Sequence, residues 1–342
     1  MYPTVSIILP TYNREKFLPE AFAAIAAQTF LDWELIVVDD GSTDGTRELV
    51  PRLTAEFSQP VRYIYQENQG AYGARNTGLD HATRKYIAFY DSDDLWLPHH
   101  LEDCVDALEA NPDVDWVYGA CRMVDHPTGK ELAASTFYVE GQPRPFLQLK
   151  TRAAGKLRII EDETVLECMI THGLYNGLQN SVMRSQLFDG VRFEAASRNE
   201  AEDQLFVIAS LRRGFQMAYI DSVHLDYRVH DANSSAAGGA ADLERQTRVL
   251  RLLASGYERM LAEPNWRPNE RKALRNRLQQ EYFWKLGYST LWMSGQRVEA
   301  LEMFRRGLHH WPWDWRCWKT FILCRGISMT VRKRPKLNCH VL

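Results

Sequence analysis

Over the first 125 residues, short apolar segments alternate with longer segments of helical spacing, and this pattern constrains the fold more than any other feature. The segments 5–9, 34–38 and 86–90 are almost wholly apolar and too short for helices, so each is predicted to be a strand buried on both faces. Such alternation predicts an α/β fold with a mostly parallel central sheet flanked by helices. The remaining predicted elements are helices over residues 15–28, 46–57, 71–81 and 98–110 and strands over residues 61–65 and 114–118.

The pattern changes twice further along the chain. Residues 126–160 lose the regular spacing and are rich in glycine and proline, so we expect an irregular excursion over the active face. Regular signals return over residues 163–223, and the segment SSAAGGAA at 234–241 is predicted to be a linker. Beyond it only helical spacing occurs. The sequence therefore predicts a first domain over residues 1–235 and a helical extension over residues 242–342.

Charge and cysteine content exclude some classes of function. The net charge of −3 at pH 7 gives no reason to expect nucleic acid as the partner. The six cysteines include no C-x-x-C pair, which suggests neither a zinc site nor a disulfide framework, and we interpret them as small buried side chains in a reducing compartment. No signal peptide and no run of about 18 apolar residues is visible, so the cytoplasm is the expected location.

Acidic residues follow two of the predicted strands, where parallel sheets bind their ligands. Asp91, Asp93 and Asp94 come directly after the strand at 86–90. Carboxylates that converge at a strand end suit a hard divalent cation, Mg²⁺ or Mn²⁺, which can bridge a diphosphate. The alternative is an acidic surface turn that caps the helix beginning at Pro98.

The second acidic pair, Asp39 and Asp40, ends the strand at 34–38. A carboxylate there is placed to accept hydrogen bonds from a base imide or a ribose. The alternative is a turn in which Thr43 or Asp44 caps the next helix. Arg75, near the start of the helix at 71–81, is placed to reach a phosphate, and the alternative is an exposed arginine on a tightly packed helix.

Two later segments also carry ionisable side chains. Glu202 and Asp203 begin a predicted helix, and a carboxylate there suits a general base that takes a proton from an attacking hydroxyl. Acidic residues are also common at helix starts because they favour the helix dipole. His230 suits a metal ligand or a phosphate contact, and a structural histidine is the alternative.

Taken together, these segments resemble the inverting family-2 glycosyltransferases of the GT-A fold. The resemblance covers about residues 3–235, and the motifs follow one another in the family's order and spacing. It is carried by VSIILPTYN (5–13), QTF (28–30), ELIVVDDGSTD (34–44), NQG (68–70), ARNTG (74–78), DSDD (91–94), ED (202–203) and YRVH (227–230). It implies a GT-A catalytic domain over residues 1–235.

The resemblance also implies roles for individual residues. Tyr12 is expected along the nucleotide base and Asp40 in contact with it, while Asp203 is expected to be the catalytic base. The implied nucleotide-binding residues are Pro10, Tyr12, Asp39, Asp40, Arg75 and Asp93; the implied metal ligands are Asp94, Asp93, Asp91 and His230; and the implied donor-sugar residues are Asn180, Ser181 and Glu202. The implied cofactor is Mn²⁺ or Mg²⁺.

The implied reaction is a single in-line displacement that inverts the anomeric configuration. The donor is a nucleotide-diphosphate sugar, with UDP-sugars favoured, and the acceptor is a hydroxyl of a glycan, a lipid-linked sugar or a protein. Two alternatives stay open. A sugar nucleotidyltransferase usually carries a glycine-rich loop after its first strand, where this chain has PTYN at 10–13. A non-catalytic binding protein on the same scaffold would be favoured by loss of the acidic residues, which are all present here.

The extension at 242–342 contains many aromatic residues. Residues 291–312 resemble one helical hairpin of the tetratricopeptide kind, with Ala300, Phe304 and Leu308 at core spacing, and we expect it to pack on the catalytic domain or on a partner. The apolar FIL at 321–323 and the basic RKRPK at 332–336 favour peripheral contact with the inner face of an anionic membrane. The alternative is a packed helix with a solvated basic tail.

Overall fold

The computed structural model describes residues 4–55, 57–173, 177–193, 202–230 and 240–332. The chain divides into two compact units, Met1–Ala236 and Ala237–Leu342. The predicted linker at 234–241 and the predicted domain boundary fall mainly outside the described residues.

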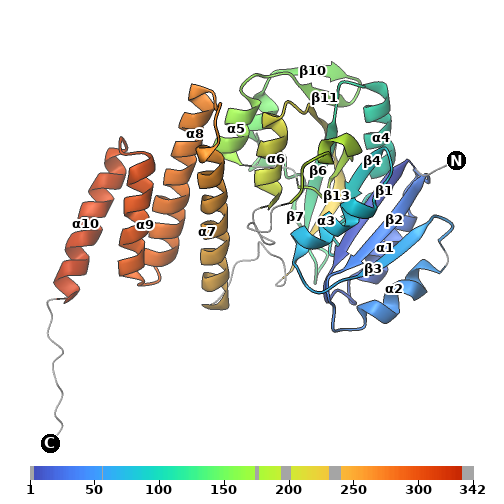
Figure 1. Cartoon of the computed structure of the whole chain (residues 1–342), viewed down its shortest axis with the longest axis horizontal. Helices are drawn as coiled ribbons and strands as arrows, with labels where there is room; N and C mark the ends of the chain where they lie inside the picture. Colours follow the sequence, from blue (N-terminus) through green and yellow to red (C-terminus); the bar gives the residue numbers. More distant parts are fainter. Residues whose placement is uncertain (1–3, 56, 174–176, 194–201, 231–239, 333–342) are drawn as a thin grey trace, which may run out of the picture. The chain divides into compact units, whose positions relative to one another are not determined.

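The first unit is built on an 11-stranded sheet (Figure 1), nine strands of which follow the order β10-β11-β13-β6-β12-β4-β1-β2-β3. The other two are β5 (Leu95–Trp96), which pairs with β13, and β7 (Glu131–Ala133), which pairs with β6. One parallel group consists of β1 (Val5–Thr11), β2 (Trp33–Asp39), β3 (Val61–Tyr65) and β4 (Tyr86–Phe89). A second consists of β6 (Trp116–Asp125) and β13 (Met217–Val229), and β12 (Ser181–Arg184) joins the two groups by antiparallel pairing. The predicted α/β fold is thus confirmed.

Helices cover both faces of this sheet, which explains why its strands are continuous apolar runs. In β1, Ile7 belongs to the core cluster that includes Phe22, whereas Ile8 packs in a second cluster with Leu79. The helices of this unit are α1 (Leu18–Ala26), α2 (Thr46–Thr54), α3 (Ala71–His81), α4 (His100–Ala110), α5 (Val165–His172) and α6 (Glu202–Arg212).

Residues 126–160 are more regular than the sequence indicated. Their last two strands form a hairpin that pairs with β13 and extends the sheet at its edge. The strands have too few residues to show a periodic pattern, but Phe137 and Phe146 are fully buried and pack against each other. The elements are β7 (Glu131–Ala133), β8 (Tyr138–Val139), β9 (Gln142–Pro143), η1 (Pro145–Gln148), β10 (Thr151–Ala154) and β11 (Leu157–Ile160).

The second unit is all-helical, as predicted, over its described residues. Ala300, Phe304 and Leu308 are buried, and the rings of Phe283 and Phe304 stack with their centroids 4.4 Å apart. The tetratricopeptide-like hairpin stays a prediction. None of the described helices is long and apolar enough to cross a membrane. The elements are α7 (Ala240–Ala262), α8 (Pro268–Gln279), a π-helical segment (Gln280–Trp292), α9 (Arg297–His310) and α10 (Trp315–Arg332).

The contact between α3 and β1 gives a test of the sheet packing. A Cβ atom added to Gly78 would lie 2.3 Å from Cγ2 of Ile8, which is fully buried in β1. Gly78→Ala should therefore lower the free energy of unfolding by about 1–3 kcal/mol, as overpacking does, despite alanine's better helix propensity. Urea unfolding measures this, with Thr77→Ala in the same helix as the control. A Gly78→Ala protein as stable as the control would contradict the packing.

Candidate active site

The predicted acidic residues gather at the carboxyl ends of the parallel strands. Asp39 ends β2 and Asp40 follows it, while Asp91, Asp93 and Asp94 follow β4. The residue that follows β13 brings an imidazole to the same place, because Nε2 of His230 lies 3.3 Å from Oδ2 of Asp93. Residues that are far apart in the chain therefore meet at one edge of the sheet.

The three carboxylates that follow β4, Asp91, Asp93 and Asp94, form the acidic cluster, and Asp94 is the most enclosed of them, with 2% of its surface exposed. Its Oδ1 accepts a hydrogen bond from the backbone N–H of Arg228 at 3.0 Å, and its carbonyl accepts one from the hydroxyl of Tyr90 at 2.8 Å. Burial raises the pKa of Asp94 well above its usual value, and the charges of Asp93 and Asp91 raise it further. The fold therefore holds this carboxylate where its negative charge is poorly compensated.

Asp93 is in a different environment although it is the adjacent residue. Burial raises its pKa, but the hydrogen bond with His230 and the charge of Arg14 lower it more, so that the pKa lies below its usual value. The guanidinium of Arg14 approaches the carboxylate to 3.5 Å. Asp93 is thus the member of the cluster whose charge the surrounding groups stabilise.

Arg75 connects the acidic cluster to the predicted catalytic base. Its guanidinium donates to Oδ1 of Asp91 at 3.0 Å and lies 3.6 Å from Oδ1 of Asp203. The arginine is 5% exposed and also lies over the ring of Phe193. Burial raises the pKa of Asp91, although the charge of Arg75 opposes this effect. Arg75 therefore brings the first residues of α6 to the end of β4.

The cluster fits a hard divalent cation by its chemistry. It offers carboxylate oxygens, and burial raises the pKa values of Asp91 and Asp94, an effect that neighbouring carboxylates increase and that a nearby cation would oppose. Among the described residues, the groups of three His, Cys, Asp or Glu ligand atoms that lie within 4.8 Å of one another do not include these four residues, so the predicted ligands do not form a compact coordination sphere. Their role as metal ligands stays a prediction.

The carboxylates predicted to bind the nucleotide make internal hydrogen bonds. Asp39 is fully buried and accepts hydrogen bonds from the backbone of Ser42 at 2.8 Å and the hydroxyl of Tyr63 at 2.5 Å. Asp40 accepts two hydrogen bonds at Oδ1 and one at Oδ2, the latter from the N–H of Gly70 at 2.7 Å. Because a carboxylate oxygen has two lone pairs, Oδ2 of Asp40 keeps the capacity for one more donor.

An exposed aromatic side chain lies at the end of β1. Tyr12 follows β1 with 47% of its surface exposed, and Pro10 lies one residue before the end of the same strand. A ring that the fold leaves uncovered beside Asp40 offers a surface for stacking. This placement agrees with the expected position of Tyr12 along a base, which remains a prediction.

The predicted donor-sugar residues are less accessible. Asn180 and Ser181 are fully buried at the start of β12. The amide of Asn180 donates to the carbonyl of Gly119 and accepts from the N–H of Gly177, and the hydroxyl of Ser181 donates to the carbonyl of Gly177. Both side chains therefore make internal hydrogen bonds, and their role at the donor sugar stays a prediction. Glu202 begins α6, and its side chain lies outside the described residues.

The sequence patterns did not predict the set of arginine and aromatic side chains that lies beside Asp93. Phe17 stacks on His230 with ring centroids 4.7 Å apart, and the guanidinium groups of Arg228 and Arg14 lie 5.3 and 5.6 Å from the Phe17 ring centroid. The spacing of two residues between Arg228 and His230 was a usable signal, because alternate residues of a strand share a face. No comparable signal pointed to Phe17.

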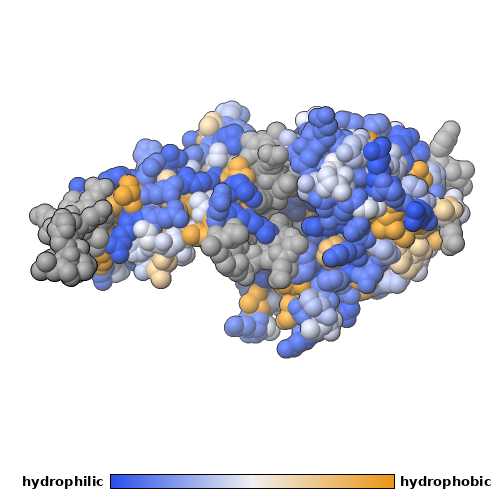
Figure 2. Space-filling view, turned by 90° about the horizontal axis from the view of Figure 1, so that it is seen from below, coloured by the Kyte–Doolittle hydropathy of each residue, from blue (hydrophilic) through white to orange (hydrophobic). Residues whose placement is uncertain are grey.

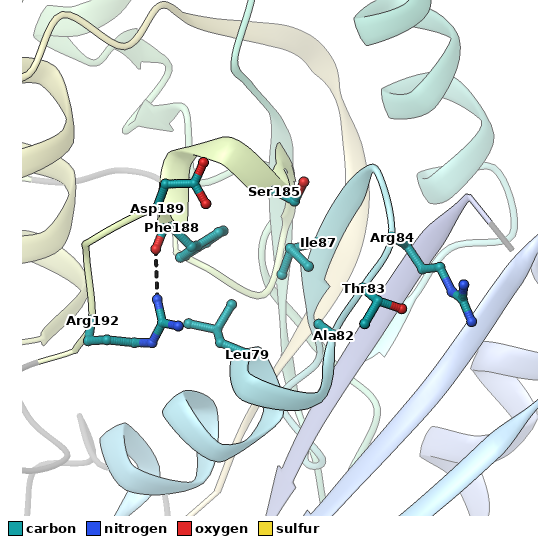
Figure 3. Close-up of a pocket in the computed structure, with 9 residues that line it drawn as sticks. All are labelled: Leu79, Ala82, Thr83, Arg84, Ile87, Ser185, Phe188, Asp189 and Arg192. Carbon is teal, nitrogen blue, oxygen red and sulfur yellow. Dashed lines mark hydrogen bonds between the residues drawn. The ribbon is translucent and has the colours of Figure 1, made fainter.

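A polar hollow lies at the opposite end of β4 (Figure 3). It is lined by residues of the end of α3, the start of β4 and the short helix η2 (Ser185–Phe188), and Arg192 donates to the carbonyl of Phe188 at 2.7 Å. Arg84 and Arg192 at its rim pair with Glu34 and Asp80. The hollow lacks the acidic cluster, so it is not the candidate active site.

Residues 6–164 match the family model for glycosyl transferase family 2. An Escherichia coli UDP-Glc:alpha-D-GlcNAc-diphosphoundecaprenol beta-1,3-glucosyltransferase is 34% identical over 166 residues, which are 47% of this chain and 61% of that protein. The succinoglycan biosynthesis protein ExoW of Rhizobium meliloti is 31% identical over 215 residues, 61% of this chain and 65% of that protein. The chain thus spans less than two thirds of the length of these curated relatives.

Solved structures show the same fold. TarS 1–349 of S. aureus in complex with UDP-GlcNAc has a TM-score of 0.63 at 21% identity, covering 90% of this chain and 81% of that one. A mannosyltransferase from Pyrobaculum calidifontis in complex with GDP-Man and Mn²⁺ has a TM-score of 0.57 at 19% identity, covering 98% and 89%. The GT-A fold expected from the sequence is confirmed.

The raised pKa of Asp94 predicts a gain in stability on neutralisation. An acid whose pKa is raised by folding lowers the stability of the native state as pH rises from its unfolded-state pKa to its raised folded-state pKa, so at pH 7 Asp94 weakens the metal-free fold. Asp94→Asn keeps an acceptor for the Arg228 N–H and should raise Tm in chelator; a gain of about 1 kcal/mol corresponds to about 2–4 °C. Thermal unfolding at pH 7 measures it.

The wild type provides the matched comparison for this variant. Added Mn²⁺ should raise the Tm of the wild type more than that of Asp94→Asn, because the variant lacks one of the predicted carboxylate ligands. A lower Tm for Asp94→Asn in chelator would contradict the electrostatic account.

Proposed function

We propose that the protein is a glycosyltransferase of family 2, whose model matches residues 6–164, and that it transfers a sugar from a nucleotide-diphosphate sugar to an acceptor hydroxyl in glycan or polysaccharide biosynthesis. UDP-sugars are the favoured donors. The observation that carries the proposal is the position of Arg75, which lies between Asp91 and Asp203 and so joins the acidic cluster to the residue proposed as the base.

The proposed reaction is a single displacement with inversion. Asp203 accepts the proton of the acceptor hydroxyl as its oxygen bonds to the anomeric carbon, and the bond from that carbon to the diphosphate oxygen breaks. Arg75 positions the carboxylate of Asp203 at 3.6 Å. A divalent cation, Mn²⁺ or Mg²⁺, held by Asp94, Asp93, Asp91 and His230 would neutralise the departing diphosphate.

The nucleotide is proposed to lie across the ends of β1 and β2. Tyr12 would stack on the base, and the free lone pair on Oδ2 of Asp40 would accept a hydrogen bond from it. Asp39 and Pro10 would shape this part of the site, and Asp93 would contact the ribose. Arg14 supplies a positive charge beside the acidic cluster, where the anionic donor needs one.

Two alternatives are less well supported. A sugar nucleotidyltransferase usually has a glycine-rich loop after its first strand, where this chain has PTYN at 10–13. A non-catalytic binding protein would be favoured by loss of the acidic residues, and this chain retains them at Asp91–Asp94 and Asp203. The E. coli relative uses UDP-Glc and a diphosphoundecaprenol-linked acceptor according to its name. We order the acceptors of this protein as polysaccharide, then lipid-linked glycan, then protein.

The helix α10 supports a further part of the proposal, which is contact with an anionic membrane surface. Its buried side consists of Cys317, Phe321 and Cys324, while Trp315 and Ile322 on the other side are 69% and 65% exposed. Hydrophobic side chains appear among hydrophilic ones toward the C-terminal end of this unit in Figure 2. The further exposed apolar residues of this region are Trp313, Trp318, Leu323 and Ile327.

The positive charge of this region favours an anionic membrane as the partner that binds this surface. Residues 315–342 contain seven Lys and Arg residues and no Asp or Glu. Aromatic side chains enter the headgroup region of a bilayer, and each cation near an anionic surface adds about 1 kcal/mol of attraction. The proposed position is peripheral, on the inner face of the membrane.

Replacement of the proposed base should separate chemistry from binding. Asp203→Asn should lower the rate of sugar transfer by at least about 100-fold, the lower range for loss of general base catalysis, while nucleotide affinity stays within a few-fold of the wild type. The measurement is release of UDP from UDP-glucose and UDP-GlcNAc with a panel of lipid-linked and oligosaccharide acceptors. Calorimetry gives the nucleotide affinity of each variant.

The matched control for this experiment is Asp189→Asn, which changes a carboxylate outside the acidic cluster in the same unit. Its transfer rate should equal that of the wild type. If the folded Asp203→Asn protein transferred sugar at the wild-type rate, Asp203 would not be the catalytic base. That result would not bear on the proposed donor site.

Membrane contact is tested by sedimentation with lipid vesicles. The full chain should pellet with vesicles that contain phosphatidylglycerol and much less with vesicles of phosphatidylcholine alone. The variant with Trp315→Glu, Trp318→Glu and Ile322→Glu should lose this binding, because it places acids in the apolar surface. Val298→Glu, at a residue of α9 that is 66% exposed, is the control. Equal pelleting of both variants would contradict the assignment to α10.

A further inference from the structure

Two histidines and a cysteine meet in the interior of the first unit, outside the candidate active site. His100 and Cys104 lie one turn apart in α4, and His224 lies in β13; both elements are labelled in Figure 1. All three side chains are fully buried. Nδ1 of His100, Sγ of Cys104 and Nδ1 of His224 all lie within 4.8 Å of one another.

The distances between these atoms resemble the edges of a metal coordination sphere. The two Nδ1 atoms are 3.3 Å apart, and Sγ of Cys104 lies 3.9 Å from Nδ1 of His100 and 4.0 Å from Nδ1 of His224. Tetrahedral Zn²⁺ with bonds of about 2.0–2.1 Å to nitrogen and about 2.3 Å to sulfur places its ligands about 3.3 Å (N to N) and about 3.6 Å (N to S) apart. A small shift of Cys104 would complete the match.

The backbone around His224 is adapted to hold its ring in the interior. The register between β13 and β6 shifts on both sides of Val223, so an irregularity in the strand directs His224 inward. A Cβ atom on Gly119 of β6 would lie 2.3 Å from the His224 ring. Position 119 therefore needs a glycine to admit the imidazole.

The second nitrogen of His224 has the partners expected of a metal ligand. Its Nε2 lies 3.1 Å from the hydroxyl of Ser222 and 3.9 Å from Oδ2 of Asp103. Metal-bound histidines usually donate their other N–H to such a group, which fixes the ring and leaves Nδ1 free to bind. Burial lowers the pKa of His224 to about 4, so the ring is neutral at physiological pH, as a ligand must be.

We propose that His100, Cys104 and His224 bind a borderline-soft transition metal ion, with Zn²⁺ as the first candidate. Imidazole and thiolate donors select such ions over the Mg²⁺ or Mn²⁺ that suit the carboxylates of the candidate active site. Among the described residues, no fourth side chain joins this group of three, so a water molecule would be the fourth ligand. On binding, the thiol of Cys104 loses its proton to solvent and its sulfur donates an electron pair to the metal.

The site would have a structural consequence for the candidate active site. It joins α4, which follows the acidic cluster, to β13, which contains Arg228 near its end and is followed by His230. A metal ion there would hold the two segments that place Asp93 beside His230. The proposal does not depend on the proposed sugar transfer.

Cobalt substitution tests the site directly. The full chain is stripped with chelator and titrated with Co²⁺ in excess Mg²⁺, which occupies the oxygen ligands of the acidic cluster. We expect a thiolate-to-cobalt charge-transfer band and tetrahedral visible bands that saturate at one equivalent and disappear on addition of Zn²⁺. Because even outer-shell partners are worth about 10- to 100-fold in metal affinity, Cys104→Ala should weaken binding by at least about 100-fold and abolish the charge-transfer band.

Cys121→Ala is the matched control, because Cys121 is also buried in the first unit and lies outside the group. This variant should keep the spectrum of the wild type. Circular dichroism verifies that each variant folds, and Gly119→Ala serves as a second perturbation that leaves all three ligands in the sequence but crowds His224. A wild type without the charge-transfer band, or a Cys104→Ala protein that retains it, would overturn the proposal and leave a hydrogen bond between the two imidazoles.

Discussion

The guanidinium of Arg75 is the contact on which the geometry of the candidate active site depends. It is buried between Asp91, which follows β4, and Asp203 of α6, and so holds two segments together whose carboxylates would otherwise repel. Its own helix begins at amides that donate to Asp40. Asp40, which is proposed to contact the nucleotide base, is thus connected through α3 to Asp203, which is proposed to take the proton of the acceptor hydroxyl. Removal of one partner from such a buried ion pair is far more costly than its net contribution suggests.

The rest of the fold supplies the frame for this contact. Short parallel strands end at one edge of the sheet and place Asp40 and Asp94 there, and the long strand β13 returns to the same edge with Arg228 and His230. The surroundings give two adjacent carboxyl groups different acidities, because the pKa of Asp93 is lowered and that of Asp94 is raised. Because burial and the neighbouring carboxylates disfavour the ionised form of Asp94, a cation bound there would stabilise that form, as the proposed metal site requires.

Local patterns were sufficient for the sheet and for the acidic cluster, because both depend on short segments such as 34–40 and 86–94. They could not predict contacts whose two residues are distant in the sequence. The hairpin of β10 and β11 is too short to show periodicity, the internal hydrogen bonds of Asp39 depend on Tyr63, and the burial of Asn180 depends on Gly119. The group formed by His100, Cys104 and His224 was missed for the same reason, since its third member lies 120 residues from Cys104.

Calorimetric titration with UDP, GDP, dTDP and CDP, each with Mn²⁺ and then with chelator, tests the central claim most directly. We predict that one nucleotide, UDP in first place, binds the wild type in the presence of Mn²⁺, and that chelator or the substitution Asp94→Ala abolishes this binding. If none of the four nucleotides binds the folded protein with Mn²⁺ present, the carboxyl ends of β1, β2 and β4 are not a nucleotide-sugar site and the proposed function is wrong.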